Sequence, residues 1–524
     1  MIAILSKQTD LKAAKLVEAA FRRSVSRPQA KRMSGAGLLL HHHDIDVLVV
    51  INPDDYLASV IELFLSVKKA KVILFGSLAK ELIYRLKFES VEFHNDINIW
   101  CNSLSAPAHS FAQSLGRIVY SEHNLLDGQD WDRALERFDF ADEWNNLGFG
   151  AIRNDGSIWS LSDKIKAPKE NALAELVING SHLCSYAALY DDPDSSILWF
   201  NRSVGPIDSF EWHIVERFIA SWRHKELPVL PVLLDLPWGH EAAVTMRLDC
   251  DEDISSANEL WQTYRDENVP FSLAIHAANL EHREHDECMR AMLSEGVAFL
   301  SHSLTHAPNW GGSYEAARHE AAASAQKIAH ILQHHIRYAV SPFHQNPDYA
   351  LNALCDVGYQ GFIGGIIRND PEFLMARGGE IADMPSGFIG HSQQVMLHGD
   401  CLLKNTDPMA VYKKSFDIFS ASKMLFGYLD HPFSSRYQYG WKTESQRSQA
   451  HKSLIEYIRQ KIPSVLFMSE ILAMDFILDK TQIKIRKTTL GFEVCKSGDK
   501  KTNLAPTILF CGNFSSSENR MLTI

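Results

Sequence analysis

The sequence predicts a multidomain α/β protein, and three observations support this fold class. The chain has 524 residues, which at roughly 150 residues per domain suggests about three or four domains. Hydrophobic residues make up 46% of the chain and charged residues 22%, which is ordinary for a globular protein and excludes a disordered or collagen-like chain. Short apolar, β-branched runs alternate with helical stretches along most of the sequence, as in parallel sheets covered by helices.

The front of the chain shows this alternation clearly. The apolar run Asp46–Ile51 is followed by a helical stretch over residues 56–67 and by a second apolar run, Lys71–Phe75. Strand, helix and strand at this spacing predict a βαβ unit with a parallel sheet. No glycine-rich phosphate-binding motif follows either strand. We expect a Rossmann/flavodoxin-like α/β module over residues 1–120, then a second small α/β module with a proline-rich linker over residues 121–240.

The rest of the chain divides into one long segment and one short one. Residues 241–478 alternate strands and helices over the length of one large α/β domain. Residues 479–524 are polar and lack a helical period, but contain the β-prone runs Gln482–Arg486 and Thr507–Phe510. We therefore expect a small β-rich C-terminal appendage.

Charge, cysteines and apolar runs indicate where the protein acts. Lys and Arg number 52 against 64 Asp and Glu, a net charge of −12, which argues against a nucleic-acid-binding protein. No apolar run is long enough for a transmembrane segment, and the first residues lack the pattern of a signal peptide. The eight cysteines include no C-x-x-C pair and are expected to be reduced thiols. These features favour a cytoplasmic protein.

An acidic cluster follows a predicted strand in the large domain. Val244–Leu248 has strand character, and Asp249 and Asp251 come where that strand ends. On a continuing strand the two side chains point to the same side. Two carboxylates this close repel each other, so each needs a cation, a proton or a metal. The alternative is a solvated acidic turn that caps a helix starting at Ser255.

A histidine pair follows another strand about fifty residues later. His302 and His306 come directly after the apolar run 297–301. At this spacing both imidazoles lie on one face of a helical turn, where they can bind one metal, although a coincidental surface pair is the alternative. Carboxyl ends of parallel strands meet at one edge of a sheet or barrel. We therefore expect Asp251 to join the two histidines in a catalytic His₂-Asp metal site with an open coordination position.

These motifs resemble a known family. The order D-x-D, H-S-x-x-H, a Pro-containing loop and a late L-x-H is similar to the polysaccharide deacetylases of the NodB-homology group, carbohydrate esterase family 4, over about residues 242–478. The form Arg247-Leu-Asp-Cys-Asp251 resembles a branch that includes deformylases of lipid-linked aminosugars. The resemblance implies a distorted (β/α) barrel of the NodB type and a divalent metal, zinc first, with cobalt, nickel or manganese as alternatives.

The resemblance also implies a role for each motif residue. Asp249 matches the catalytic base, and Phe343, in the Pro-containing loop, supplies a backbone N–H to the oxyanion hole. His431, in the L-x-H motif, matches the general acid, with His398 as the rival candidate. The metal ligands match Asp251, His302 and His306.

Two features depart from the family pattern. Val340 stands where the family has the arginine that orients the base, and Phe343 replaces a tyrosine. Arg247 and Arg368 are the candidates for the missing cation. A D-x-x-x-W motif is not evident after Pro342.

Other side chains have two interpretations each. His276, at the end of another predicted strand, either packs in the core or reaches the rim of the same site. The aromatic residues after His431 either stack on a sugar ring or pack in the core. They are Phe433, Tyr437, Tyr439 and Trp441.

The function that follows is a metal-dependent hydrolase that removes an N-acetyl or N-formyl group from a sugar. Its partner is an N-acylated sugar or glycan precursor, and the setting is the biosynthesis of a bacterial surface polysaccharide or lipopolysaccharide. Two alternatives remain open: a hydrolase of a non-sugar linear or cyclic amide, and a catalytically degenerate protein that binds glycan without turnover.

Overall fold

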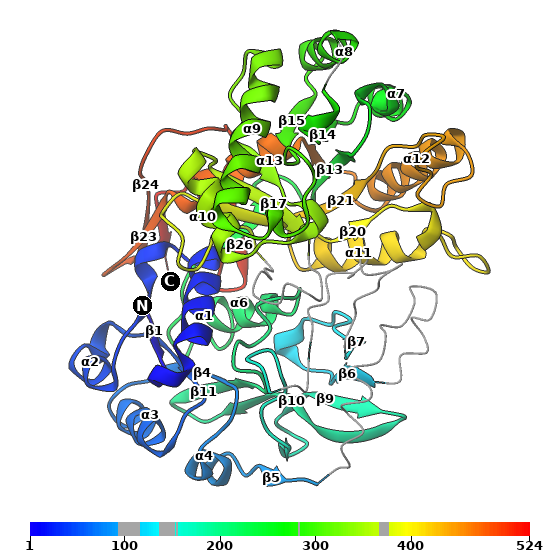
Figure 1. Ribbon diagram of the computed structural model, residues 1–524. Coiled ribbons are helices and arrows are strands. Elements are labelled where there is room, and N and C mark those ends of the chain that lie inside the picture. The colour runs from blue at the N-terminus through cyan, green and yellow to red at the C-terminus, as the bar shows by residue number, and fades with distance from the viewer. Residues whose placement is uncertain (93–115, 136–151, 153–155, 281–282, 366–376, 524) are drawn as a thin grey trace.

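The computed structural model describes residues 1–92, 116–135, 152, 156–280, 283–365 and 377–523. A nine-stranded sheet and a ten-stranded sheet organise these residues. In Figure 1 the nine-stranded sheet lies at the bottom, and the ten-stranded sheet with its surrounding helices lies above it. Both ends of the chain lie at the left of this view, near the boundary between the two sheets.

The nine-stranded sheet is parallel over its first five strands, in the order β2, β1, β3, β4 and β11. These strands are β1 (Ile2–Leu5), β2 (Ala30–Arg32), β3 (Val47–Ile51), β4 (Ala70–Phe75) and β11 (Ser195–Phe200). Helix α1 (Leu11–Ser24) packs on one face of this sheet and helix α3 (Asp55–Val67) on the other. Because both faces are covered, the predicted strands β3 and β4 are buried along their whole length.

The same sheet continues with antiparallel strands from the next part of the chain. They are β10 (Ser181–Asp191), β9 (Ala172–Ile178), β6 (Gly116–Tyr120) and β7 (Arg133–Ala134). The expectation of two modules divided near residue 120 therefore differs from the structure, in which β4 pairs with β11 over six residues. The reason is that β4 is buried on both faces, and its backbone groups need a partner strand on this edge.

The C-terminal residues form strands where the sequence predicts them, but these strands are not separate from the rest of the chain. Strand β25 (Pro506–Phe510) pairs with β12 (Val232–Pro237) and with β26 (Asn513–Ser516). A second small sheet contains β23 (Ile483–Thr488), β24 (Gly491–Lys496) and β27 (Met521–Thr523). The tail supplies the partner strand that β12 lacks within its own region.

The ten-stranded sheet contains a closed barrel of parallel strands. Its strands run in the order β16, β15, β14, β13 and β21 on one side, and β16, β17 and β19 on the other. The strands are β13 (Ala243–Cys250), β14 (Ser272–Ile275), β15 (Ala298–Ser301), β16 (Tyr338–Val340), β17 (Gly361–Gly365), β19 (Ile389–Gln393), β20 (Val395–Met396) and β21 (Phe426–Asp430). Strand β22 (Leu466–Met468) pairs with the start of β13, and β18 (Gly379–Glu380) pairs with β19 antiparallel.

One nearly continuous strand closes the barrel. β19 pairs with β17, and β20, only one residue further on, pairs with β21. Between them, the backbone N–H of Gln394 donates to the carbonyl of Gly427 over 3.0 Å. The predicted distorted barrel is thus confirmed. The helices around it are α7 (Asn258–Asp266), α8 (Arg283–Ser294), α9 (Tyr314–Leu332), α10 (Asp348–Val357), α11 (Ala410–Ala421), α12 (Glu444–Lys461) and α13 (Glu470–Thr481).

Buried ion pairs join the barrel to elements that precede it in the chain. Glu216, on α6 (Trp212–Ala220), accepts hydrogen bonds from Nε and Nη2 of Arg377 over 2.8 and 2.5 Å, and both side chains are buried. Ser24 at the end of α1 also donates to Glu216, over 2.6 Å. Asp235 on β12 pairs with Lys480 on α13 in the same way. Each of these buried charges therefore has its counter-charge on the other side of the boundary between the barrel and the preceding part of the chain.

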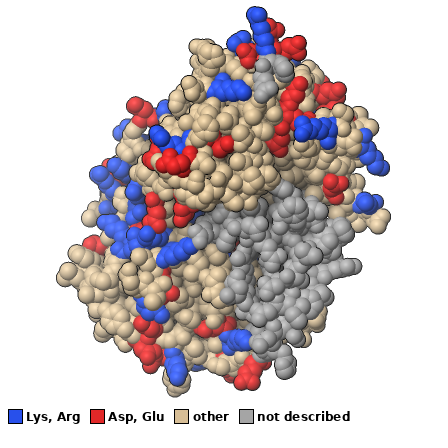
Figure 2. Space-filling view, in the orientation of Figure 1, with Lys and Arg blue, Asp and Glu red and all other residues tan. Residues whose placement is uncertain are grey.

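The surface carries charges of both signs. Figure 2 shows basic and acidic side chains interspersed on one face of the molecule, with several at the left boundary between the two halves. Lys15 on α1 and Asp383, close after β18, form one such surface pair, with 2.8 Å between Nζ and Oδ1. Among the described residues, no helix combines the length and the apolar character needed to cross a bilayer.

We predict that Glu216→Ala lowers the free energy of unfolding by about 3–5 kcal/mol, because it leaves the buried Arg377 without its counter-charge. Urea denaturation followed by circular dichroism measures this change. Glu226→Ala is the matched control, since Glu226 pairs with Arg223 at the surface and its loss costs no more than about 1 kcal/mol. Equal losses for the two variants would contradict a stabilising role for the buried pair.

Candidate functional site

Side chains from neighbouring barrel strands converge at the carboxyl ends of those strands. Asp249 lies near the end of β13 and Asp251 directly follows it, while His302 follows β15 and His431 follows β21. β13 pairs with both β14 and β21, and β14 pairs with β15. Because these strands are parallel, their ends meet at one rim of the barrel.

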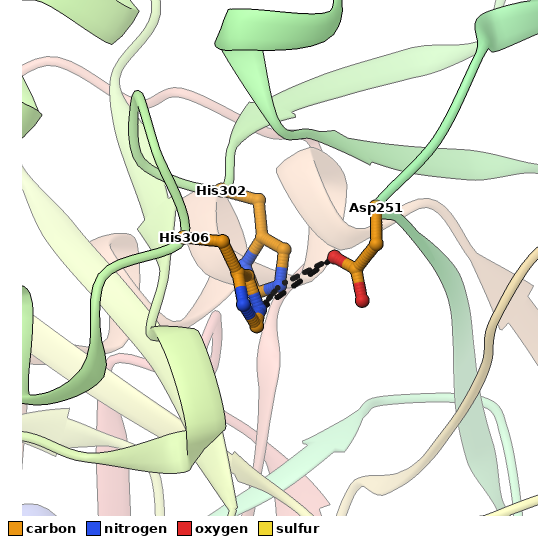
Figure 3. A group of neighbouring side chains, drawn as sticks. All are labelled: Asp251, His302 and His306. Atoms are coloured by element: carbon orange, nitrogen blue, oxygen red, sulfur yellow. Dashed lines mark hydrogen bonds and ion pairs between the residues drawn. The ribbon is translucent and has the colours of Figure 1, made fainter.

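Asp251, His302 and His306 come together as the sequence predicts (Figure 3). Oδ1 of Asp251 lies 3.4 Å from Nε2 of His302 and 3.6 Å from Nε2 of His306. The two Nε2 atoms lie 3.0 Å apart. In Figure 3 both rings, carried by one loop, point toward the carboxylate, which comes from another segment.

The histidine pair does not lie on a helical turn, so this part of the prediction is wrong. Residues 302–306 form an irregular loop in which Ser303 and His306 have left-handed φ values of 64° and 55°. Ser303 Oγ accepts a hydrogen bond from the backbone N–H of His306 over 2.9 Å. Oε2 of Glu320, a buried residue on α9, accepts from the backbone N–H groups of residues 304 and 305 over 2.9 and 2.8 Å. These hydrogen bonds, rather than a helix, bring the two rings together.

The donor set fits a divalent metal ion. Nδ1 of His302 lies 3.1 Å from the carbonyl oxygen of Val340, which fixes Nδ1 as the donor and leaves Nε2 free to bind a metal. Burial lowers the pKa of His302 to about 4 and that of His306 to about 3, so both rings are neutral, as metal ligands must be. Asp251 Oδ1 is buried and accepts no hydrogen bond from the described residues. Two imidazole nitrogens and one carboxylate oxygen are a common catalytic zinc set.

Asp249 is held by an arginine on its own strand. Nε and Nη2 of Arg247 donate to Oδ1 and Oδ2 of Asp249 over 2.6 and 3.1 Å, and both side chains are buried. Burial by itself would raise the pKa of Asp249, but the charge of Arg247 holds it well below its usual range. Arg247 therefore supplies the positive charge beside Asp249 that the side chain of Val340 cannot supply. Arg368, the other candidate, lies outside the described residues.

The structure also distinguishes the two candidate acids. Nε2 of His431 lies 3.7 Å from Oδ2 of Asp251, whereas the two histidine ligands approach Oδ1. His398 contacts Tyr439 instead, with 5.2 Å between ring centroids in an edge-to-face arrangement, and its Nδ1 is 3.7 Å from Oδ2 of Asp400. The geometry thus favours His431 over His398 for contact with a substrate at the metal site.

The predicted oxyanion loop lies against the metal ligands. Phe343 follows β16 in a short turn and has a left-handed φ of 53°. Its ring lies 4.5 Å from the ring of His306, and 38% of Phe343 is exposed. His276 also reaches the rim, because its ring lies 5.8 Å from that of His306. A hollow of about 600 Å³ opens beside Asp251 and is lined by His276, Arg436 and other polar residues.

Two further buried acids lie in the barrel domain and belong to no sequence motif. Glu320 fixes the histidine loop from α9. Glu470, the first residue of α13, lies buried against the barrel, where it accepts a hydrogen bond from Gln393 on β19 and its backbone N–H donates to Ser272 at the start of β14. Burial raises the pKa of Glu470 to about 7. Only the fold gives these residues their partners, so local sequence patterns give no sign of them.

A comparison with protein-family models identifies the barrel. Residues 251–362 match the model of the polysaccharide deacetylase family. The chain contains a polysaccharide deacetylase domain. The matched residues begin at Asp251, include both metal-site histidines and end within β17. The predicted family resemblance is thereby confirmed. No curated protein matches the chain.

Several solved structures are similar to the deacetylase domain. A Mycobacterium smegmatis protein assigned as a polysaccharide deacetylase shows 13% identity and a TM-score of 0.38, over 47% of this chain and 93% of its own. A family 4 acetyl xylan esterase from Clostridium thermocellum, in complex with a cobalt ion, shows 11% identity and a TM-score of 0.29, over 44% and 89%. An allantoinase shows 12% identity and a TM-score of 0.35, over 45% and 90%.

We predict that the purified protein binds one divalent metal ion at Asp251, His302 and His306. His302→Ala lowers the zinc affinity by more than about 100-fold, since the loss of a supporting residue alone costs 10–100-fold. Competition with a zinc-binding dye, together with metal analysis of the protein, measures this change. His335→Ala, at an exposed position at the end of α9, is the control. Undiminished metal content in His302→Ala would contradict the assignment.

The raised pKa of Glu470 predicts a pH-dependent stability. In the folded protein its pKa is about 7, against 4.5 for an ordinary glutamate. Between these two pH values Glu470 is therefore protonated in the folded protein and ionised in the unfolded chain. Stability is therefore lost as the pH rises from about 4.5 to 7. Glu470→Gln has no ionisable group at this position and does not show this loss. From pH 4.5 to pH 8, its free energy of unfolding therefore increases by about 3 kcal/mol relative to that of the wild type.

Urea denaturation of both proteins at these two pH values measures the gain. Glu170→Gln, at an exposed position, shows no such change with pH. A constant difference between wild type and Glu470→Gln at the two pH values would mean that Glu470 is ionised in the folded protein.

Proposed function

We propose that this protein is a metal-dependent hydrolase that removes an N-acyl group from a sugar. The observation that carries the proposal is the arrangement at the barrel rim. The two-histidine, one-aspartate triad shares the rim with a buried carboxylate, Asp249, two residues before Asp251, and with an imidazole, His431, whose Nε2 lies 3.7 Å from Oδ2 of Asp251. A base and an acid beside a metal site are what hydrolysis of an amide requires. The polysaccharide deacetylase domain supports the same chemistry.

The three ligands would hold a divalent metal, for which zinc is our proposal because the donor set is nitrogen-rich. When bound, such an ion polarises the acyl carbonyl and lowers the pKa of water. Asp249 would accept the proton of the attacking water. Its two contacts with Arg247 keep the carboxylate ionised and fixed in orientation, so that it is ready to act as a base.

Two other groups would stabilise the oxyanion and protonate the leaving amine. The backbone N–H of Phe343 would donate to the oxyanion, because the turn that carries it lies against His306. His431 would donate a proton to the leaving amine, which is a poor leaving group until protonated. Burial lowers the pKa of His431 to about 4, so it starts neutral and must first gain a proton. The proton that Asp249 takes from water is available for this step.

The substrate we propose is an N-acetylated or N-formylated sugar precursor of a bacterial surface polysaccharide or lipopolysaccharide, met in the cytoplasm. The hollow beside Asp251, of about 600 Å³, has the size of a small-molecule site. Its polar lining suits a ligand rich in hydroxyl groups. The resemblance of the Arg247–Asp251 motif to that of aminosugar deformylases supports the formyl alternative.

We predict that Asp249→Asn lowers kcat by about 10²- to 10⁴-fold, because it removes the base and keeps the shape of the side chain. The assay is release of acetate or formate from N-acetylglucosamine oligomers and N-acyl nucleotide sugars by the metal-loaded protein. Metal content and circular dichroism of the variant are compared with those of the wild type, which separates loss of the base from loss of the fold. Asp266→Asn, at an exposed position on α7, is the control.

The same assay separates the competing functions. A wild-type protein that binds metal and glycan but releases no acyl group is a glycan-binding protein. One that hydrolyses only linear or cyclic amides without a sugar acts on another substrate class. Either result would overturn the proposed function.

A further inference from the structure

The ring of His431 lacks the hydrogen bond that ordinarily fixes an imidazole at a reaction centre. Its Nε2 faces Asp251, but its Nδ1 is buried and has no hydrogen-bond partner among the described residues. The orientation of a catalytic histidine is usually set by the bond that its other nitrogen makes, often to a carboxylate or a carbonyl. Another contact must therefore define the plane of this ring.

Tyr439 makes that contact. Its ring stacks on the ring of His431, with 4.5 Å between centroids and 19° between planes. Its hydroxyl lies 3.5 Å from Oδ2 of Asp251, the same oxygen that His431 faces. The rings of His398 and Tyr439 lie edge to face, with 5.2 Å between centroids and 79° between planes. Tyr439 is thus packed between two imidazoles and beside one metal ligand.

The backbone at Tyr439 is strained and tightly enclosed. Tyr439 has a left-handed φ of 45°, which is unfavourable for an aromatic residue, and Gly440 has φ 75°. The backbone N–H of Gly399 donates to the carbonyl of Tyr439 over 3.0 Å. A Cβ on Gly440 would lie 2.1 Å from the backbone nitrogen of Asp400, so the two loops cross with no space for a side chain. Strain of this kind persists only where the surroundings hold it, and it is most frequent at active sites.

We propose that Tyr439 is the positioning residue for His431. The stacked ring holds the imidazole plane so that Nε2 faces the place where the leaving nitrogen departs, next to Asp251. An aromatic face thus does here what a hydrogen-bonded carboxylate or carbonyl does at other histidines. The role of His431 as proton donor is part of the proposed function, and the inference about Tyr439 rests on it.

Two substrates with different leaving groups test the inference. An N-acetylglucosamine oligomer releases an amine that must be protonated, whereas 4-nitrophenyl acetate releases a phenolate that leaves without a proton. The metal-loaded wild type, Tyr439→Phe and Tyr439→Leu are assayed on both. Tyr457→Leu is the matched control, since Tyr457 lies on α12 outside the barrel and bonds to Asp417.

We expect Tyr439→Leu to lose about 100-fold in kcat on the oligomer and to keep ester hydrolysis within about threefold. Tyr439→Phe, which keeps the ring, stays within about threefold of wild type on both substrates. Equal losses on both substrates in Tyr439→Leu would show a structural or metal defect and overturn the inference. So would no loss on either substrate, or a loss in Tyr439→Phe as large as that in Tyr439→Leu. A wild type that releases no acyl group from the oligomer or from N-acetylated and N-formylated nucleotide sugars overturns the proposed function instead.

Discussion

The ion pair between Arg247 and Asp249 is the constraint on which the rest of the site depends. Side chains at alternate positions of β13 share one face, so Thr245, Arg247 and Asp249 follow one another along the same side of the strand. All three are buried, in a barrel whose interior is usually aliphatic. A buried charge is tolerated only when it is paired, so neither member can be removed alone without a large loss of stability. Stability and reactivity are therefore linked at this position.

The pairing of the parallel strands then decides which other groups meet this pair. β13 pairs directly with β21, which brings the residue after β21, His431, next to the residue after β13, Asp251. The histidine loop arrives from β15 on the other side and is held by Glu320. The functional groups thus come from the ends of four strands, β13, β15, β16 and β21, and a single closed sheet sets the distances among them. The shared edge of parallel strands is the reason that distant motifs combine into one site.

Much of this site is predictable from sequence because its residues occur in short motifs directly after apolar runs. Asp249, Asp251, His302, His306 and His431 are all of this kind. The helical turn at His302 is predicted wrongly, because the loop conformation depends on Glu320, a residue of the next helix. The stacking of Tyr439 is equally hidden, since it depends on two loops that cross at Gly399 and Gly440. The division near residue 120 fails for the same physical reason: pairing of β4 with β11 joins residues more than a hundred positions apart, which no local pattern records.

The pairing of β12 with β25 has a consequence for how the chain is made. Strand β12 ends at residue 237, but its partner begins at residue 506. A ribosome that adds about 5–20 residues per second needs on the order of tens of seconds to cover that interval. During this time β12 has no partner strand among the described residues, because its small sheet consists of β12, β25 and β26. The final strands thus act as a closing step in biogenesis, and a nascent chain that stops short of them would present an open edge to chaperones.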